Sequence, residues 1–191
     1  GTTADGWRSA GNGHGVWIVN SPDNLIGGTT PEERNLISGN LVTGVTIEGP
    51  DAHGNLVIGN FIGTKVSGTA SLPTRRNGIV IAGAPENIIG RPIPGASNVI
   101  SGNYGTGVRI LEPEASGNRV QGNHIGVDVS GRFAIGNGAK GIWIRSPNNL
   151  IGGAAPGEGN IISNNGRAGV IIQSPWATGN RIEGNLIGTA V

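Results

Sequence analysis

The sequence predicts an all-β solenoid, a coil of about six rungs with three short parallel strands in each rung. Two observations predict it. Segments of similar sequence recur at a fixed period, and apolar runs of only three or four residues alternate with asparagine and glycine. Runs this short and this rich in Val and Ile favour strands over helices. We therefore expect one solenoid domain over residues 1–191.

The internal repeat has a period of about 63 residues. The segment Asn35–Asn40 returns as Asn98–Asn103 and as Asn160–Asn165, at offsets of 63 and 62 residues. Three superrepeats follow, at about 1–62, 63–125 and 126–187. Because the chain begins and ends at the same phase of this period, we expect a fragment of a longer array whose ends can associate head to tail.

Each superrepeat divides into two rungs, and each rung into three strands. The first strand carries the pattern Gly-[Val/Ile]-x-Ile, which starts at Gly15, Gly44, Gly78, Gly107, Gly141 and Gly169. Asparagine precedes the second strand at Asn24, Asn55, Asn87, Asn118, Asn149 and Asn180. It also precedes the third at Asn35, Asn60, Asn98, Asn123, Asn160 and Asn185. We expect these asparagines to form corner columns, because Asn tolerates left-handed backbone and its amide both donates and accepts hydrogen bonds.

The middle residues of the second and third strands are predicted to fill an aliphatic interior, since side chains alternate along a strand. Ile89 and Ile100 are examples, and polar neighbours such as Arg119 and Gln121 are predicted to point outward. Stacked at the usual strand spacing of ~4.8 Å, the rungs would form a rod with a narrow core.

Composition excludes several classes of function. The chain has no Cys, so it has no disulfides, no thiolate metal site and no cysteine nucleophile. Its net charge is +1, from 13 basic and 12 acidic residues that are scattered singly. We therefore expect no nucleic-acid partner. No apolar run reaches the length of a membrane span, so membrane insertion is not expected either.

The segments Gly-Asn-x-Ile-Gly, Asn-x-Ile-Ser-Gly-Asn and Gly-Val-x-Ile resemble the repeats of right-handed parallel β-helix proteins of the pectin-lyase-like fold. In particular, the chain is similar to secreted bacterial proteins that carry long arrays of Asn-x-Ile-Gly-Gly and Ile-Ser-Gly-Asn segments. The resemblance implies a bacterial location outside the cell or at its surface. It leaves activity open, because this solenoid carries lyases, hydrolases, adhesins and stalks.

Exposed aromatic residues give a candidate carbohydrate-binding site. Trp17 and Trp143 occupy outward positions on the first strand of their rungs, and Trp176 lies in a turn. Flat aromatic faces bordered by hydrogen-bonding side chains commonly hold sugars. The predicted site consists of Trp17, Trp143, Trp176, Arg109, Arg145 and Gln173.

Acidic residues after the first strand give a candidate for weak calcium binding. Asp23, Asp51, Glu86 and Glu114 each follow a proline, and they could stack into one column of carboxylates. The alternative is that Pro-Asp and Pro-Glu are ordinary turn pairs. No other cofactor is expected.

No predicted outward strip offers the two carboxylates that a glycoside hydrolase requires. We therefore expect a non-catalytic, rigid scaffold or stalk of a secreted or cell-surface protein, with a polysaccharide as its candidate partner. The alternative is a polysaccharide lyase or glycoside hydrolase of the β-helix type.

Overall fold

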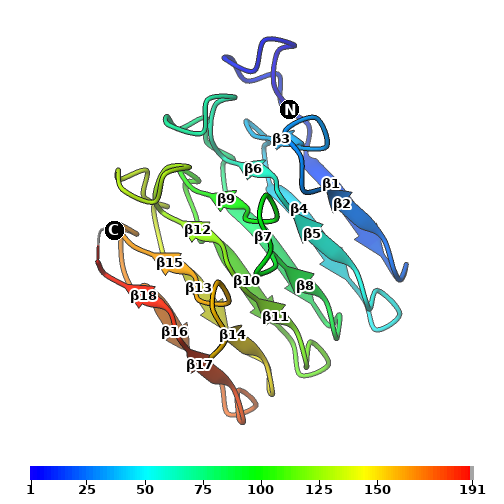
Figure 1. Cartoon of the computed structure of the whole chain (residues 1–191). Helices are drawn as coiled ribbons and strands as arrows, with labels where there is room; N and C mark the ends of the chain where they lie inside the picture. Colours follow the sequence, from blue (N-terminus) through cyan, green and yellow to red (C-terminus); the bar gives the residue numbers. More distant parts are fainter. Residues whose placement is uncertain (190–191) are drawn as a thin grey trace.

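The computed structural model describes residues 1–189, which form three parallel sheets of six strands each (Figure 1). The first sheet contains β1 (His14–Val19), β4 (Thr43–Glu48), β7 (Asn77–Ala82), β10 (Val108–Leu111), β13 (Ile142–Ile144) and β16 (Val170–Ile172). The second sheet contains β2 (Leu25–Gly27), β5 (Leu56–Ile58), β8 (Ile88–Ile89), β11 (Arg119–Val120), β14 (Leu150–Gly152) and β17 (Arg181–Glu183). The third sheet contains β3 (Leu36–Ile37), β6 (Phe61–Ile62), β9 (Val99–Ile100), β12 (His124–Ile125), β15 (Ile161–Ile162) and β18 (Leu186–Ile187).

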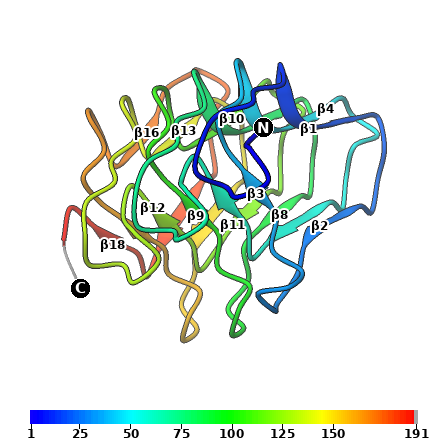
Figure 2. The same cartoon turned by 90° about the horizontal axis from the view of Figure 1, so that it is seen from above.

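Each rung adds one strand to every sheet, which confirms the predicted parallel β-helix. Ile79 of β7, for example, pairs with Val45 of β4 on one side and with Val108 of β10 on the other. Seen from above, successive turns of the chain follow one another around a common interior (Figure 2). No helix long and apolar enough to cross a membrane occurs in residues 1–189.

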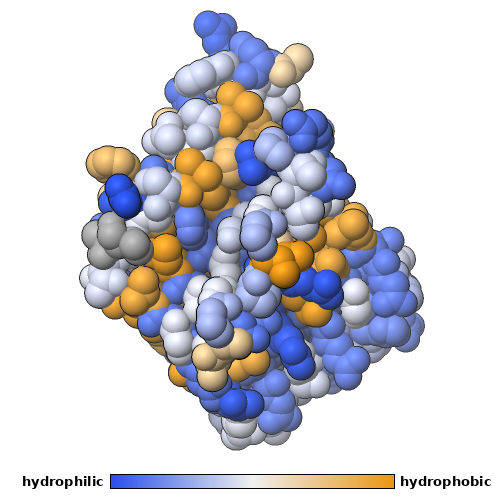
Figure 3. All heavy atoms as spheres, in the orientation of Figure 1, coloured by the Kyte–Doolittle hydropathy of each residue, from blue (hydrophilic) through white to orange (hydrophobic). Residues whose placement is uncertain are grey.

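The interior consists of aliphatic columns, as the alternation of side chains predicts. Ile89 and Ile100 are completely buried, and equivalent residues of the neighbouring rungs lie directly above and below them. Burial of one such side chain contributes about 2 kcal/mol of hydrophobic free energy. On the face shown in Figure 3, exposed apolar side chains form small separate patches among hydrophilic ones.

The glycine at the start of each first-sheet strand, as its second residue or directly before it, is required by close packing at a corner. A Cβ on Gly44 would lie 2.6 Å from the carbonyl oxygen of Gly78 and 2.7 Å from Cγ2 of Ile62. The other five glycines of this column have the same kind of neighbours, except that at Gly169 an isoleucine alone lies this close. The column therefore lets the first and third sheets meet without a side chain between them.

Both predicted asparagine columns are present. Asn55 Oδ1 accepts hydrogen bonds from the main-chain N of Asn24 at 2.9 Å and from its Nδ2 at 2.8 Å. Asn60 Oδ1 accepts in the same way from Asn35. The expectation of left-handed backbone at these asparagines is wrong. In the first column, positive φ falls on the residue before each asparagine, such as Asp23 at 57°.

A third column was not predicted from the sequence. It runs through Asn12, Asn40, Thr74, Asn103, Asn137 and Asn165. The carbonyl oxygen of each of the first five accepts a hydrogen bond from the main-chain N of the residue that follows the next member, as Asn40 does from Arg75. Asn137 Oδ1 accepts two hydrogen bonds from Asn103, at 3.1 and 3.0 Å. These ladders satisfy buried corner groups that water cannot reach.

Candidate functional site

The outer face of the first sheet carries the predicted carbohydrate-binding residues, but at two separate places. Arg109 of β10 is paired in register with Trp143 of β13, and Arg145 directly follows β13. Trp17 lies on β1, with β4, β7 and β10 between it and β13. At the strand spacing of ~4.8 Å, Trp17 and Trp143 are roughly 19 Å apart along the sheet.

Four residues, Arg109, Lys140, Trp143 and Arg145, form what we call the Trp143 cluster. Lys140 Nζ lies 3.6 Å from the centre of the Trp143 ring, and the Arg109 guanidinium carbon lies 4.6 Å from it. Arg145 approaches the same ring at 5.7 Å. Three cations thus surround one half-buried indole, an arrangement stabilised by the attraction between a cation and an aromatic face.

Positive charge in this cluster lacks a nearby acidic partner. Within residues 1–189 the one ion pair joins Arg181 to Glu183, away from the cluster. Burial, and then the charge of Arg145, lowers the pKa of Arg109. Desolvation, followed by the charges of Arg167 and Arg109, lowers the pKa of Lys140. The cluster is therefore a site where an anion would relieve repulsion.

Two nitrogen atoms of the cluster are buried without a hydrogen-bond partner in the described part of the chain. They are Nε of Arg109 and Nε1 of Trp143. Both are donors only, and because they are buried, a ligand oxygen or a water molecule would reach them only after neighbouring side chains move. The accessible part of the cluster thus combines an aromatic face with net positive charge.

A small pocket adjoins the Trp143 cluster and contains the predicted residue Trp176. It has a volume of about 270 Å³ and is lined by Leu111, Glu112, Pro113, Arg145, Ser174 and Trp176. Arg145 belongs to both places, since it also faces Trp143. Gln173, by contrast, has an exposed side chain. Its main-chain N donates to the carbonyl oxygen of Ile144 at 2.9 Å.

Trp17 belongs to a different group of side chains. Its ring stacks on His14, with the ring centres 4.6 Å apart, and its Nε1 donates to Glu48 Oε2 at 3.0 Å. His14 Nδ1 in turn lies 3.0 Å from Thr46 Oγ1. Because Trp17 already has an acidic acceptor, this group offers less to an anionic ligand than the Trp143 cluster does.

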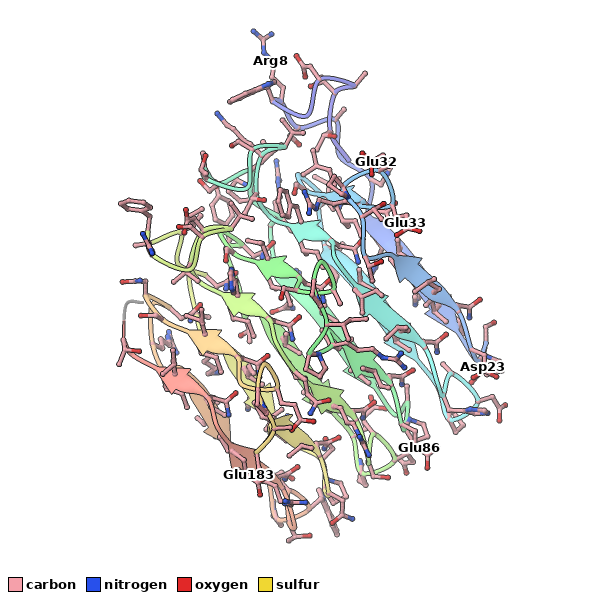
Figure 4. All side chains as sticks on the ribbon, in the orientation of Figure 1. Arg8, Asp23, Glu32, Glu33, Glu86 and Glu183 are labelled. Carbon is pink, nitrogen blue, oxygen red and sulfur yellow. The ribbon has the colours of Figure 1, made fainter. Side chains whose placement is uncertain are left out.

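The predicted calcium residues do not form one column. Asp23 and Glu86 occupy equivalent left-handed positions at turns along one edge of the helix (Figure 4), but Gly54 and Gly117 hold that position in the rungs that follow them. Asp51 and Glu114 lie three residues before these glycines, so they are out of register with Asp23 and Glu86. Residues 1–189 contain no group of three or more His, Asp or Glu side chains placed to hold a metal ion.

Lys140 was not among the residues predicted from the sequence. It lies in the turn two residues before β13, outside the strand pattern from which the outward columns are derived. It directly precedes Gly141 of the periodic glycine column, and the residues at this position in other rungs, such as Thr43 and Thr106, are uncharged. Only the folded corner places its amine over the ring of Trp143.

These features define a parallel β-helix with a cationic, aromatic site on its first sheet. In comparisons with known proteins, no family model and no curated protein match the sequence. Solved structures of the periplasmic alginate epimerase AlgG are similar in fold. One superposes with a TM-score of 0.59 at 18% identity, over 91% of this chain and 36% of the epimerase. A mutant form gives a TM-score of 0.59 at 18% identity, over 89% of this chain and again 36% of that chain.

Proposed function

We propose that the chain binds an acidic polysaccharide at the Trp143 cluster, as the recognition part of a bacterial polysaccharide-active protein located outside the cytoplasm. The observation that carries this proposal is the convergence of Arg109, Lys140 and Arg145 on one indole ring with no acidic partner. A uronic acid unit matches it, because its ring can lie against the indole while its carboxylate meets the cations.

The structural comparison supports the same class of ligand. The similar fold belongs to a periplasmic alginate epimerase, an enzyme that acts on a polysaccharide. The likeness covers 36% of that enzyme, so any catalytic activity of this chain is argued from its own residues.

The cluster suits reactions at the carbon next to a carboxylate better than hydrolysis by paired acids. Removal of a proton from that carbon places negative charge on the carboxylate, and fixed cations stabilise such charge. Epimerisation and elimination share this step. Glu112 is the one carboxylate among the cluster residues and those that line the adjoining pocket, whereas hydrolysis requires two flanking carboxylates.

A scaffold that binds the polysaccharide at this cluster without converting it is the alternative to an enzyme of this kind. It is favoured by the absence, within residues 1–189, of a histidine or second carboxylate among the residues that form the cluster and its pocket. The two candidates differ in turnover. Formation of unsaturated or epimerised sugar units by the purified chain would establish the enzyme, and binding without any product would establish the scaffold.

The binding proposal is tested by calorimetric titration of a short oligogalacturonate and of a neutral oligosaccharide of equal length. We expect Trp143→Ala to weaken oligogalacturonate binding by about tenfold or more, since an aromatic stacking contact and the alignment of three cations are lost. The matched control is Trp17→Ala, which removes an exposed indole from the same sheet. It should leave the affinity for a short oligomer unchanged.

The same titration is repeated at several salt concentrations. Affinity for the acidic oligomer should fall as ionic strength rises, because screening weakens attraction between exposed charges. Equal affinity for the neutral oligosaccharide, or unchanged binding in Trp143→Ala, would refute the proposed site.

A further inference from the structure

Glu112 has a backbone conformation that is unusual for its residue type. Its φ is 72°, and in the two preceding rungs the equivalent positions are Gly49 and Gly83, with φ of 92° and 61°. The equivalence follows from the register, because Ala82 pairs with Glu48 on one side and with Leu111 on the other. Gly49, Gly83 and Glu112 directly follow these paired residues. A left-handed conformation is unfavourable for residues with a Cβ and is uncommon for Glu. A carboxylate is thus held at a left-handed position that Asn20, with φ of 46°, and the two glycines occupy in the earlier rungs. Such strain is typical of functional positions.

The carboxylate of Glu112 fits against the preceding rung because Gly83 has no side chain there. Glu112 Oε2 lies 2.9 Å from the place where a Cβ of Gly83 would be. Glu112 also lines the 270 Å³ pocket together with Arg145 and the exposed ring of Trp176. Although Glu112 and Arg145 line the same pocket, they do not form an ion pair. Both charged groups therefore remain available to a ligand.

We infer that this pocket is a second sugar subsite for an uncharged unit, adjacent to the acidic unit on Trp143, and that Glu112 determines this specificity. The inference rests on the proposed function, because both subsites would hold neighbouring units of one chain. Arg145 lines the pocket and faces Trp143, so it joins the two subsites. Together the two subsites predict a heteropolysaccharide substrate in which a uronic acid adjoins a neutral sugar.

The charges of the two subsites carry the argument. The Trp143 cluster contains three cations and no carboxylate, so it favours an anionic unit. The pocket contains one carboxylate and one guanidinium beside apolar Leu111 and Pro113, so its own charge is balanced. A carboxylate accepts hydrogen bonds from sugar hydroxyls and repels a second carboxylate. Trp176 supplies an aromatic face for the ring.

The test compares two acidic oligosaccharides of equal length by calorimetry. One is a hyaluronan hexasaccharide, in which glucuronate alternates with N-acetylglucosamine, and the other is an oligogalacturonate, in which every unit is charged. We expect the wild-type chain to prefer the alternating oligomer by about tenfold, the usual worth of a hydrogen bond to a charged group. Glu112→Gly and Glu112→Gln should reduce this ratio to about one.

Stability separates a functional role of Glu112 from a structural one. Glu112→Gly restores the residue found in the two preceding rungs, so it should leave the melting temperature equal or higher while the preference is lost. The matched control is Glu86→Gly. Glu86 also has a left-handed backbone, with φ of 57°, and glycine holds its position in the neighbouring rungs, but it lies away from the pocket. This variant changes the net charge equally and should keep the preference.

The outcomes are distinct. If Trp143→Ala weakens binding of both oligomers but Glu112→Gly keeps the tenfold preference, the second subsite is wrong and the proposed function stands. The same holds if the wild-type chain prefers the fully charged oligomer. If Trp143→Ala changes neither affinity, the proposed function fails, and the second subsite fails with it.

Discussion

Thr74 lies directly before Asn103 in the third asparagine column, and the Oδ1 atom of Asn103 is buried without a hydrogen-bond partner. The Oδ1 atom of each later asparagine in the column accepts two hydrogen bonds from the asparagine one rung earlier. Asn137 accepts them from Asn103, and Asn165 accepts them from Asn137. Threonine has no side-chain amide to take the place of the asparagine Nδ2. Nδ2 of Asn40 and Oγ1 of Thr74 are also buried without partners, so one substitution leaves three groups unsatisfied.

Thr74→Asn should therefore stabilise the protein. An amide at this position can donate to Asn103 and accept from Asn40, and each recovered hydrogen bond contributes about 1 kcal/mol. We expect the free energy of unfolding in urea to increase by about 1–2 kcal/mol.

The matched variant is Asn137→Thr, which introduces the same interruption two rungs later. It should destabilise the protein by a similar amount or more, because Asn103 would lose the acceptor it now uses. Equal stability of Thr74→Asn and the wild-type chain would show that the ladder does not limit stability at this corner.

The asparagine columns show what the sequence could predict about the fold. Two of them were predictable because each asparagine directly precedes an apolar run of constant length, as Asn55 precedes β5. The third column was missed, although its members from Asn40 onward each lie four residues before the glycine of the first strand, as Asn40 lies before Gly44. Thr74 interrupts the run of asparagines at this position.

The sequence placed the acidic turn residues in one column, which is wrong, because the alignment was counted from the prolines. Asp23 and Asp51 both follow a proline, but Asn24 comes one residue after Asp23 and Asn55 comes four residues after Asp51. The corner is fixed by the asparagine hydrogen bonds and not by the proline. Counting from the asparagine places Gly54 beside Asp23, as in the structure.

The candidate site was predictable where it lies on strands and unpredictable where it lies in turns. Arg109 and Trp143 share an outward column, so the repeat register brings them together. Lys140 approaches the same ring from the corner before Gly141, where other rungs carry uncharged residues such as Thr43, so the repeat gives no reason to expect a cation there. Glu112 could have been found by aligning it with Gly49 and Gly83, since a residue other than glycine in a glycine column signals strain.

His124 should make stability depend on pH near neutrality. Burial lowers its pKa below the usual 6.5, against the opposing hydrogen bond to the Asp128 carbonyl and the charge of Asp128. Between the folded pKa and 6.5 the unfolded chain binds more protons than the folded one. The free energy of unfolding should therefore decrease as pH falls through 6.5 towards the lowered pKa of the folded state.

The valine variant His124→Val isolates this effect, because the neighbours of His124 in its outward column are Val99 and Ile161. Urea unfolding at a series of pH values should give a shallower slope for His124→Val over this interval. Parallel curves for the two proteins would contradict the role of His124 and place the titration elsewhere.

Lys140 should make ligand binding depend on pH at alkaline values. Desolvation and the charges of Arg167 and Arg109 lower its pKa from 10.5, so its amine loses its proton at a lower pH than an ordinary lysine. An acidic ligand favours the charged amine and raises that pKa. The affinity for oligogalacturonate should therefore fall as pH rises through the lowered pKa, with proton uptake on binding in that range.

Lys140→Arg removes this dependence, since a guanidinium keeps its charge at these pH values. Calorimetry in buffers of different ionisation enthalpy measures the proton uptake directly. The arginine variant should bind without uptake and with constant affinity. Identical pH profiles of the wild-type chain and the variant would exclude Lys140 from the binding site.

The final rung presents inward-facing side chains that no further rung covers in residues 1–189. Ile172, Ile182 and Ile187 are 43%, 37% and 44% exposed, whereas Ile144, Ile151 and Ile162 in the preceding rung are completely buried. A second copy of the chain could cover this surface with its first rung and continue the parallel pairing. We therefore predict concentration-dependent, head-to-tail association of a polypeptide with this sequence.

Ile187→Lys should prevent this association, because it removes an apolar contact and would bury a charge at the junction. Ile93→Lys is the matched control. Ile93 is 46% exposed and lies in the loop between β8 and β9, on the outside of the helix. Sedimentation over a wide concentration range should show larger species for the wild-type chain and for Ile93→Lys, and monomers for Ile187→Lys. A wild-type chain that stays monomeric at the highest concentration would show that burial of these three isoleucines does not offset the entropy of association.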